Sequence, residues 1–404
     1  MSKIDDMVAR LCPDGVEYKA LGDVCFYAKE KMPVSGLTCD VYTGVECLIK
    51  DFGGRRAADS IPSTGKCTQV QKGDILLGNI RPNLRKIWLA DCDGGASNDV
   101  LVLRLQTEQL IPKFVYYTLA GESFFDFDVQ HARGGKMPRG NKSMILTFEI
   151  PVPPLEIQQE IVRVLDSFAE LEAELEAELE ARKAQYAHYR DKLLDFTERE
   201  SVSWLKLGEV GTFKRGRRFT KADYRDCGIP SIHYADIYTK LGTWTESAVA
   251  YVDEAKRTSL RYAQPGDVVI ACTGEDSDDI AKAVAWLGDE PAAVHDDCCV
   301  FHHEQNPKYI AYLFQTNRFT RFKKRYATEA KLRRLSSERI AQFAIPVPPL
   351  SEQRRIVEIL DRFDALTTSL TDGLPAEIEA RRQQYEHYRD RLLDFPHKDA
   401  RRIA

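Results

Sequence analysis

One stretch of this sequence occurs twice, and the repetition restricts the possible folds more than any other feature. Residues 150–155 read Ile-Pro-Val-Pro-Pro-Leu and recur at 345–350, an offset of 195 residues. A second block, 180–196, recurs at 379–395 with an offset of 199, so the second copy holds four additional residues between the blocks. Because an internal repeat of this kind indicates one structural unit used twice, we expect two related halves.

Weaker similarities extend the repeat toward the start of each half. They are Leu21-Gly22 with Leu207-Gly208, Lys72–Ile75 with Pro265–Val268, Pro112–Phe114 with Pro307–Tyr309, and Lys136 with Lys331. Usual domain sizes then give two domains in the 404 residues, and the repeat places a helical segment after each. We predict a globular domain over 1–150, a long helix over 151–198, a second globular domain over 199–345 and a second helical region over 346–396. The globular domains have diverged from each other while the helical segments have not, so we expect the two domains to bind different ligands.

The residues after Pro154 predict one long amphipathic helix. From Ile157 to Leu193 apolar side chains recur every three or four residues, apart from one gap of seven, and no glycine or proline interrupts them. A helix over 155–196 would be about 63 Å long at 1.5 Å per residue. The second copy keeps the pattern, but Asp372-Gly373-Leu374-Pro375 lies inside it and predicts a kink or break at 372–375.

The order of the parts also predicts a topology. Only residues 197–203 separate the first helix from the second globular domain, so the two domains are expected near opposite ends of that helix. The second helix must then run back along the first, and antiparallel packing would create an approximate internal two-fold axis.

Each globular domain reads as a mixture of short strands and helices. Strands are predicted at 74–80, 86–90, 99–105, 267–273, 281–287 and 298–302, and helices that begin at a proline at 112–130 and 307–327. The predicted fold class is therefore α+β: two mixed α/β globular domains joined by two long antiparallel helices that form a coiled-coil-like rod with a pseudo-two-fold repeat.

Composition excludes several classes of protein. Lys and Arg total 57 against 62 Asp and Glu, so overall charge does not indicate a nucleic-acid partner and any such argument must be local. The ten cysteines form no Cys-x-x-Cys pair, which favours reduced core residues over a zinc ribbon or a disulfide framework. No apolar run approaches the roughly 18 residues of a membrane span, and we expect a cytoplasmic protein without membrane contact.

Motifs for catalysis or cofactor binding are also missing from the sequence. Gly65-Lys66 lacks the first glycine and the Ser or Thr of a phosphate-binding loop, and 211–216 is not a dinucleotide fingerprint. His295, Cys298-Cys299 and His302-His303 lack zinc-ligand spacing, so a strand with adjacent core cysteines is the favoured interpretation. We expect a chain without catalytic residues, metal or cofactor of its own.

Basic residues, in contrast, gather in a few segments. We predict DNA binding by Arg81, Arg85, Lys86, Arg133, Lys136, Arg139 and Lys142 in the first domain, and by Lys214, Arg215, Arg217, Arg218, Lys221, Lys323, Lys324, Arg325, Lys331, Arg333 and Arg334 in the second. A solvated charged face is the alternative for any single cation. Basic residues precede both Ile-Pro-Val-Pro-Pro segments, and this recurrence favours binding.

These features together resemble a known family. Leu11–Tyr18 with Leu21-Gly22, the segment Arg81–Lys86, the Gly266-Asp267 turn and the duplicated Pro-rich entry into a long helix resemble the specificity (S) subunit of type I restriction-modification systems. The resemblance implies that each globular domain reads one half of a bipartite DNA site and that the helical rod sets the spacer and docks methyltransferase subunits. It also implies that S-adenosylmethionine, ATP and Mg belong to partner subunits.

The implied partners are double-stranded DNA, two modification subunits and the restriction subunits. Two other classes stay open at this point: a scaffold that does not bind DNA, and a DNA-processing enzyme with an unrecognised site. The segment 169–180, which repeats Ala-Glu-Leu-Glu three times, is either a good helix former or a ruler within the spacer helix.

Overall fold

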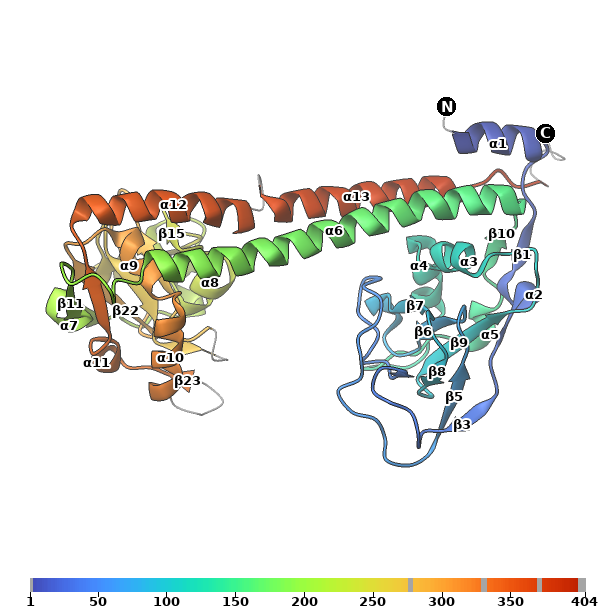
Figure 1. The fold of residues 1–404 in the computed structure, drawn as a ribbon, viewed down its shortest axis with the longest axis horizontal. Coiled ribbons are helices and arrows are strands. Elements are labelled where there is room, and N and C mark those ends of the chain that lie inside the picture. The colour runs from blue at the N-terminus through green and yellow to red at the C-terminus, as the bar shows by residue number, and fades with distance from the viewer. Residues whose placement is uncertain (1–2, 275–278, 328–332, 369–372, 399–404) are drawn as a thin grey trace. The chain divides into compact units, whose positions relative to one another are not determined.

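The computed structural model describes residues 3–274, 279–327, 333–368 and 373–398 (Figure 1). The chain divides into two compact units: unit 1 contains Met1–Glu176 and Glu377–Ala404, and unit 2 contains Ala177–Ala376. Each unit holds one globular domain and portions of the long helices. The four-part division made from the sequence stays a prediction.

Unit 1 builds its globular domain on two four-stranded sheets. The first has the order β2-β9-β6-β7 and is antiparallel, with β2 at Cys25–Tyr27, β9 at Val100–Leu105, β6 at Ile75–Gly78 and β7 at Ile87–Leu89. The second has the order β3-β5-β8-β4, with β3 at Lys31–Pro33, β5 at Lys66–Val70, β8 at Gly94–Ala96 and β4 at Tyr42–Thr43. Alternate side chains of β6 enter two cores: Ile75 and Leu77 pack with the helices, and Leu76 packs toward the second sheet.

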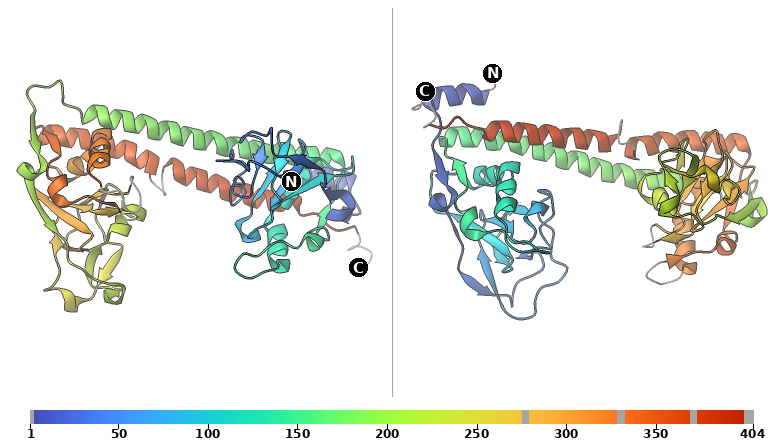
Figure 2. Two further views of the ribbon diagram at one scale, coloured as in Figure 1. Left: turned by 90° about the horizontal axis from the view of Figure 1, so that it is seen from below. Right: turned by 180° about the vertical axis from the view of Figure 1, so that it is seen from behind.

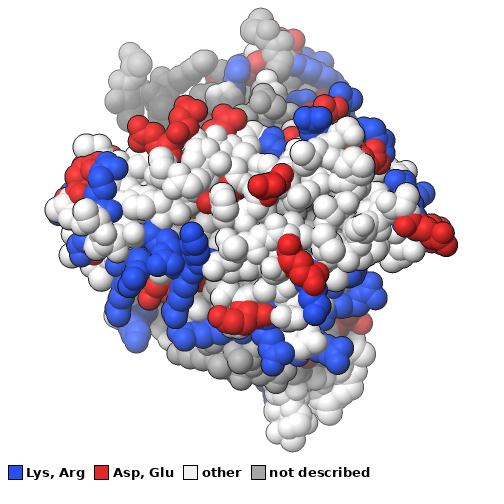
Figure 3. Space-filling model, turned by 90° about the vertical axis from the view of Figure 1, so that its left-hand side faces the viewer, with Lys and Arg blue, Asp and Glu red and all other residues white. Residues whose placement is uncertain are grey.

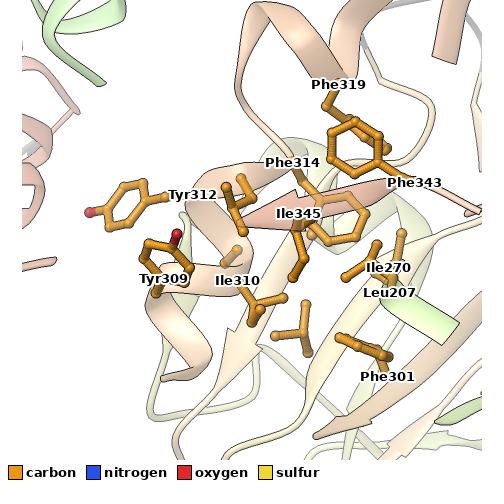
Figure 4. Close-up of a cluster of buried hydrophobic side chains, with 14 of the residues drawn as sticks. Leu207, Ile270, Phe301, Tyr309, Ile310, Tyr312, Phe314, Phe319, Phe343 and Ile345 are labelled. Carbon is orange, nitrogen blue, oxygen red and sulfur yellow. The ribbon is translucent and has the colours of Figure 1, made fainter. Parts of the chain in front are cut away.

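Unit 2 repeats this plan with five-stranded sheets. One has the order β12-β22-β18-β20-β15, with β12 at Gly211–Arg215, β22 at Cys298–His303, β18 at Val268–Ala271, β20 at Ala283–Trp286 and β15 at Trp244–Thr245. The other has the order β13-β16-β14-β21-β17, with β13 at Tyr224–Arg225, β16 at Ala250–Val252, β14 at Ile229–Ile232, β21 at Ala292–Val294 and β17 at Tyr262–Ala263. Ile270 and Phe301 meet the aromatic side chains of the helices in the main core (Figure 4). Cys298 and Cys299 are buried neighbours on β22, as the strand interpretation predicted.

Helices and short elements complete each unit. In unit 1 they are α1 (Lys3–Leu11), β1 (Tyr18–Ala20), α2 (Leu21–Val24), η1 (Pro82–Leu84), α3 (Pro112–Leu119), α4 (Glu122–His131), α5 (Lys142–Ile145) and β10 (Glu149–Pro151). In unit 2 they are β11 (Ser203–Lys206), α7 (Leu207–Val210), η2 (Lys221–Asp223), α8 (Tyr234–Thr239), η3 (Glu254–Lys256), β19 (Thr273–Gly274), α9 (Pro307–Leu313), α10 (Asn317–Tyr326), β23 (Arg333–Arg334), α11 (Ser337–Ile340) and β24 (Ala344–Val347).

The predicted single helices 112–130 and 307–327 are wrong, because each is two helices with a turn between them. In unit 1 the turn falls at Ala120-Gly121, and in unit 2 the Thr316 hydroxyl caps α10 by accepting a hydrogen bond from Phe319 N. The change of direction buries Phe124 and Phe319 completely in their cores. Burial of these rings favours the broken helix over the continuous one that the local sequence predicted.

The long helices confirm the prediction from apolar periodicity. Helix α6 spans Leu155–Leu193 without interruption, and its second-copy counterparts are α12 (Leu350–Thr368) and α13 (Leu374–Leu393). Asp372, at the start of the predicted break, lies outside the described residues. Pro375 is the second residue of α13, where its missing N–H leaves no helical hydrogen bond unmade.

In unit 1, α6 and α13 pack as antiparallel helices (Figure 2). Phe168 stacks on Tyr388 at 5.4 Å between ring centroids, and the Arg382 guanidinium donates to Glu172 Oε1 and Glu176 Oε1 at 2.9 and 3.2 Å. In unit 2, Phe363 of α12 stacks on two tyrosines of α6, Tyr186 and Tyr189.

Each globular domain is attached to its own helix through the repeated residues. Gln158 is fully buried; its Oε1 accepts from Ile111 N, and its Nε2 donates to Gln109 O and Pro153 O at 2.8 and 2.7 Å. Gln353 occupies the same place in unit 2, where it accepts from Asn306 N and donates to Pro348 O. The glutamine that follows both Pro-rich segments therefore joins the helix to the loop that precedes α3 or α9.

A second attachment explains why the repeat keeps a lysine at the same place in both halves, Lys113 and Lys308. Asp166 of α6 accepts from Lys113 Nζ at 2.8 Å and from the Tyr117 hydroxyl at 2.5 Å. Asp361 of α12 accepts from Lys308 Nζ at 2.8 Å and from the Tyr312 hydroxyl at 2.7 Å. Charge-assisted hydrogen bonds of this kind fix the orientation of the first domain helix on the long helix in both units.

The two ends of the described chain meet in unit 1. Val16 N donates to Pro396 O at 2.8 Å, Lys398 N donates to Val16 O at 3.1 Å, and the Tyr18 ring stacks on His397 at 3.7 Å. The segment after α13 thus forms a short parallel bridge to Val16, between α1 and β1.

Candidate nucleic-acid interface

The end of the central strand β6 brings two of the predicted basic segments together in unit 1. Ile80 pairs with Arg139 in an antiparallel bridge, and Arg81 N donates to Pro138 O at 2.8 Å. Arg81 and the segment 133–139 are far apart in sequence, and these backbone bonds place them side by side.

Unit 2 has the same arrangement at the end of its central strand. After β18, Thr273 pairs with Arg334 and Gly274 with Arg333. The neighbouring bonds also correspond, because Asn79 N donates to Asp99 O in unit 1 and Cys272 N donates to Asp297 O in unit 2. Both units therefore anchor a basic segment at the same place in the fold.

Five of the seven cations predicted in unit 1 are exposed: Arg81, Arg133, Lys136, Arg139 and Lys142. Among these five, Arg139 Nη2 lies 3.0 Å from Asp99 Oδ1. The other two predicted cations are half-buried and are also engaged. Arg85 Nη1 lies 3.3 Å from Glu122 Oε1, and Lys86 Nζ donates to Val45 O at 2.7 Å. Burial also lowers the pKa of Lys86. Both side chains support the local fold in this structure.

A second basic segment in unit 2 runs along β12 and the loop after it. Its cations are exposed, namely Lys214, Arg215, Arg217, Arg218 and Lys221. Backbone bonds from Gly216 N to Cys298 O and from Arg217 N to Val294 O hold the loop against β22 and β21. Figure 3 shows lysine and arginine side chains gathered on one part of the face of unit 2 that it draws.

Helix α10 separates its cations between two faces, which corrects one prediction. Lys324 and Arg325 are exposed, whereas Lys323 is 6% exposed and donates to Ile280 O at 3.3 Å. Lys323 lies four residues after the buried Phe319, so the helix turns it toward the core, and it is withdrawn as a DNA-binding residue. Arg333 and Arg334 lie on β23, and Lys331 lies outside the described residues.

Backbone strain marks a segment of unit 1 that the sequence did not indicate. Asp51 and Phe52 have φ of 53° and 62°, and Arg81 and Arg85 have φ of 54° and 50°, all in the left-handed region. Backbone hydrogen bonds join residues 51–52 to residues 84–85: Asp51 N donates to Leu84 O, and Phe52 N donates to Arg85 O. Such conformations cost about 1–2 kcal/mol per residue without glycine and concentrate at functional sites. Aspartate visits this region more often than most residues, but the phenylalanine at 52 gives no sign of it in the sequence.

A buried carboxyl group lies beneath the basic segment of unit 1. Asp128 on α4 and Asn79 after β6 are 5% and 7% exposed, and one side-chain oxygen of each makes no hydrogen bond. A Cβ on Gly140 would lie 2.6 Å from Asp128 Oδ1 and 3.1 Å from Asn79 Oδ1, so a larger residue there would have to displace these side chains. Burial raises the pKa of Asp128 to about 6, with His131 opposing the rise.

Asp128→Asn is therefore expected to stabilise the protein at neutral pH. The folded state holds the proton of Asp128 up to about pH 6, whereas an unfolded Asp releases it near pH 3.9, so stability falls as pH rises between these values. The substitution should raise the free energy of unfolding at pH 7 by up to about 3 kcal/mol and flatten its change between pH 4 and 6. Chemical denaturation across pH 4–8 measures this. Asp126→Asn, an exposed neighbour on the same helix, is the control, and equal profiles for the two variants would contradict the assignment.

One group of side chains in unit 2 has the residue types of a metal site. The candidate ligand atoms of His295, Asp296 and Asp297 lie within 4.8 Å of one another. Arg215 already places its guanidinium there, with Nε donating to Asp296 O at 2.7 Å and Nη2 3.9 Å from Asp296 Oδ2. His295 Nδ1 accepts from Asp297 N, which uses one ligand position. These contacts favour a structural role for the group.

Comparison with known proteins identifies what this arrangement is similar to. A family model described as "Type I restriction modification DNA specificity domain" matches residues 13–181 and 200–380, once in each repeat. The specificity subunit of the Escherichia coli type I restriction enzyme EcoR124I/EcoR124II is 38% identical over 61% of this chain, a match that spans 63% of that subunit's length. A putative type I specificity subunit of Haemophilus influenzae is 31% identical over 74% of this chain and 76% of its own.

Solved structures share the fold. A chain from a study of complex assembly and conformational transition of the type I R-M system aligns with a TM-score of 0.62 and 18% identity, over 94% of this chain and 97% of that chain. The type I restriction-modification S subunit from M. genitalium aligns with a TM-score of 0.51 and 16% identity, over 94% and 96% of the two chains. Among the described residues, no helix combines the length and apolar character that crossing a membrane requires.

Proposed function

Because the chain belongs to the family of type I restriction-modification DNA specificity subunits, we propose that its two globular domains each bind one half of a bipartite site in double-stranded DNA. The observation that carries this proposal is the repeated anchoring of a basic segment, Arg139 against Ile80 and Arg334 against Thr273, at the end of the central strand in both units. Two such segments on domains whose sequences have diverged support two different half-sites.

Subunits of this family are not catalytic. Methylation and cleavage, together with S-adenosylmethionine, ATP and Mg, belong to the modification and restriction subunits with which the chain assembles. Family membership therefore removes the scaffold and enzyme alternatives. The duplicated helical segments offer two similar docking surfaces, which supports two modification subunits per chain. A subunit that reads DNA works where the DNA is, so we place the chain in the cytoplasm.

Reversing the charge of Arg333 and Arg334 tests the basic segment of unit 2. The double Arg→Glu variant should weaken binding to all duplexes, by roughly tenfold or more at low salt, because lost phosphate contacts are independent of sequence. If both side chains meet phosphates, the slope of log affinity against log salt should fall by about 2. Titration of the reconstituted complex against labelled duplexes at several salt concentrations measures both quantities.

A matched control carries the same change of charge elsewhere. Lys240→Glu with Arg257→Glu changes two exposed side chains outside the predicted segments, whose ion pairs with Asp236 and Glu254 are local to their own turns. This variant should leave affinity and salt slope close to those of the unchanged protein. Unchanged affinity of the Arg333/Arg334 variant at low salt would show that β23 does not face DNA.

A further inference from the structure

The loop between Arg133 and Arg139 has a closed base. Arg133 N donates to Arg139 O and Arg139 N donates to Arg133 O, both at 2.8 Å. Two further backbone bonds fasten this base to the end of β6, from Arg81 N to Pro138 O and from Gly140 N to Asn79 O at 2.8 and 3.2 Å. The loop 134–138 is therefore presented by a firmly held base.

Only two long side chains project from the tip of this loop. Gly134, with φ of 105°, and Gly135 have none, and Pro138 follows directly. The remaining residues are Lys136 and Met137. Met137 is 53% exposed, more than any other large hydrophobic side chain in the described part of the protein.

An exposed apolar side chain among cations matches one mode of DNA contact. Arg133, Lys136 and Arg139 flank Met137 and are exposed, so attraction to phosphates would draw the tip onto the duplex. Between the phosphate chains a side chain meets base edges and stacked base steps. Proteins that bind the minor groove frequently insert an apolar residue between base steps, methionine included, and a flexible thioether adapts to the irregular gap.

We propose that Met137 is a specificity-determining residue that inserts at a base step in the half-site bound by unit 1, while Lys136 contacts the adjacent phosphate. The proposal rests on the proposed function. It predicts two separable contributions to the affinity for DNA. The apolar contribution of Met137 depends on how easily the base step unstacks, and the ionic contribution of Lys136 depends on the salt concentration.

The test compares Met137→Ala and Lys136→Ala in the complex with modification subunits, on the site found by methylation mapping. Met137→Ala should weaken binding to that site about tenfold without changing the salt slope, because no charge is removed. Lys136→Ala should lower the salt slope by about 1. Met137→Leu should restore most of the affinity, since leucine also serves as a wedge. Because Met137 is exposed, all variants should keep the fold, which circular dichroism checks.

Fluorescence of 2-aminopurine at successive positions of the half-site locates the insertion. Because methyltransferases flip their target base out of the stack, the position of the methylated adenine is left out of the series. At one other step the unchanged protein should raise the fluorescence, and Met137→Ala should abolish that rise. If the unchanged complex binds no DNA, the proposed function fails. If it binds, but Met137→Ala binds equally well or no position shows a rise, the function stands and the insertion is refuted.

Discussion

Inserting one additional Ala-Glu-Leu-Glu unit into 169–180 should move the complex to a site whose non-specific spacer is longer by one, or at most about two, base pairs. Four residues add about 6 Å of helix, and one base pair rises about 3.4 Å. The half-site sequences should not change, since neither globular domain is altered. Activity on the original site should fall roughly 100-fold or more, because a displaced domain meets mismatched bases at about 1–3 kcal/mol each. Deleting one unit should shorten the spacer by the same amount.

Contacts of the repeat in unit 1 explain why the insertion should be tolerated. Arg382 of α13 binds Glu172 and Glu176, which occupy the same position in successive repeat units. With Phe168 held on Tyr388, an added unit again places glutamates at the two positions that face Arg382 and leucines at 171 and 175. Four residues rotate the helix by about 400°, which leaves the apolar stripe only about 40° out of place.

Mapping methylated adenines in DNA modified by the variant complex measures the new spacer. An insertion of Ala-Glu alone is the control, because two residues turn the helix by about 200° and should abolish activity by moving the apolar stripe to the opposite face. Changed half-sites, or an unchanged spacer with full activity, would show that this helix is not the ruler.

Replacing Gln158 with leucine should lower the free energy of unfolding of unit 1 by about 3–5 kcal/mol. Leucine has a similar volume and leaves no large cavity. It cannot hydrogen-bond, however, so Ile111 N, Gln109 O and Pro153 O would be buried without their partner. Each unsatisfied buried group costs about 1–3 kcal/mol. Chemical denaturation, combined with hydrogen exchange of the peptide that holds α3, measures the loss and its location.

Two further Gln→Leu variants act as controls. Gln159→Leu changes the exposed neighbour on α6 and should cost less than about 0.5 kcal/mol. Gln353→Leu should reproduce the loss in unit 2, with increased exchange in α9 and little change in α3. A loss below about 1 kcal/mol for Gln158→Leu would show that water replaces the amide at this junction.

Local periodicity was sufficient to predict the long helices. In a helix of 39 residues such as α6, the spacing of the apolar residues along the sequence alone indicates the helix. The repeat also identified residues before their role was visible. Lys113 and Lys308 stood out only as similar positions, and the structure shows that they bind Asp166 and Asp361. Similarity between the halves thus located contacts, although it could not say what each residue contacts.

Features that depend on distant packing could not be predicted in this way. The turn at Ala120-Gly121 exists because Phe124 must reach the core, and Lys323 turns inward because of its position relative to Phe319. The strain at Asp51 and Phe52 arises from bonds to 84–85. A list of charged residues contains no information on which ones the fold buries, so the predicted interface needed correction at Lys323. The remaining basic residues stay predictions.

The bridge between Val16 and His397 has a consequence for the order in which the protein forms during synthesis. Unit 2 is a continuous stretch, complete once residue 376 has left the ribosome, whereas unit 1 takes most of α13 and the residue that bridges to Val16 from 377–398. Domains generally fold as units while the chain emerges. The face of α6 around Phe168 therefore stays without its α13 partner until residues that follow the whole of unit 2 have been synthesised.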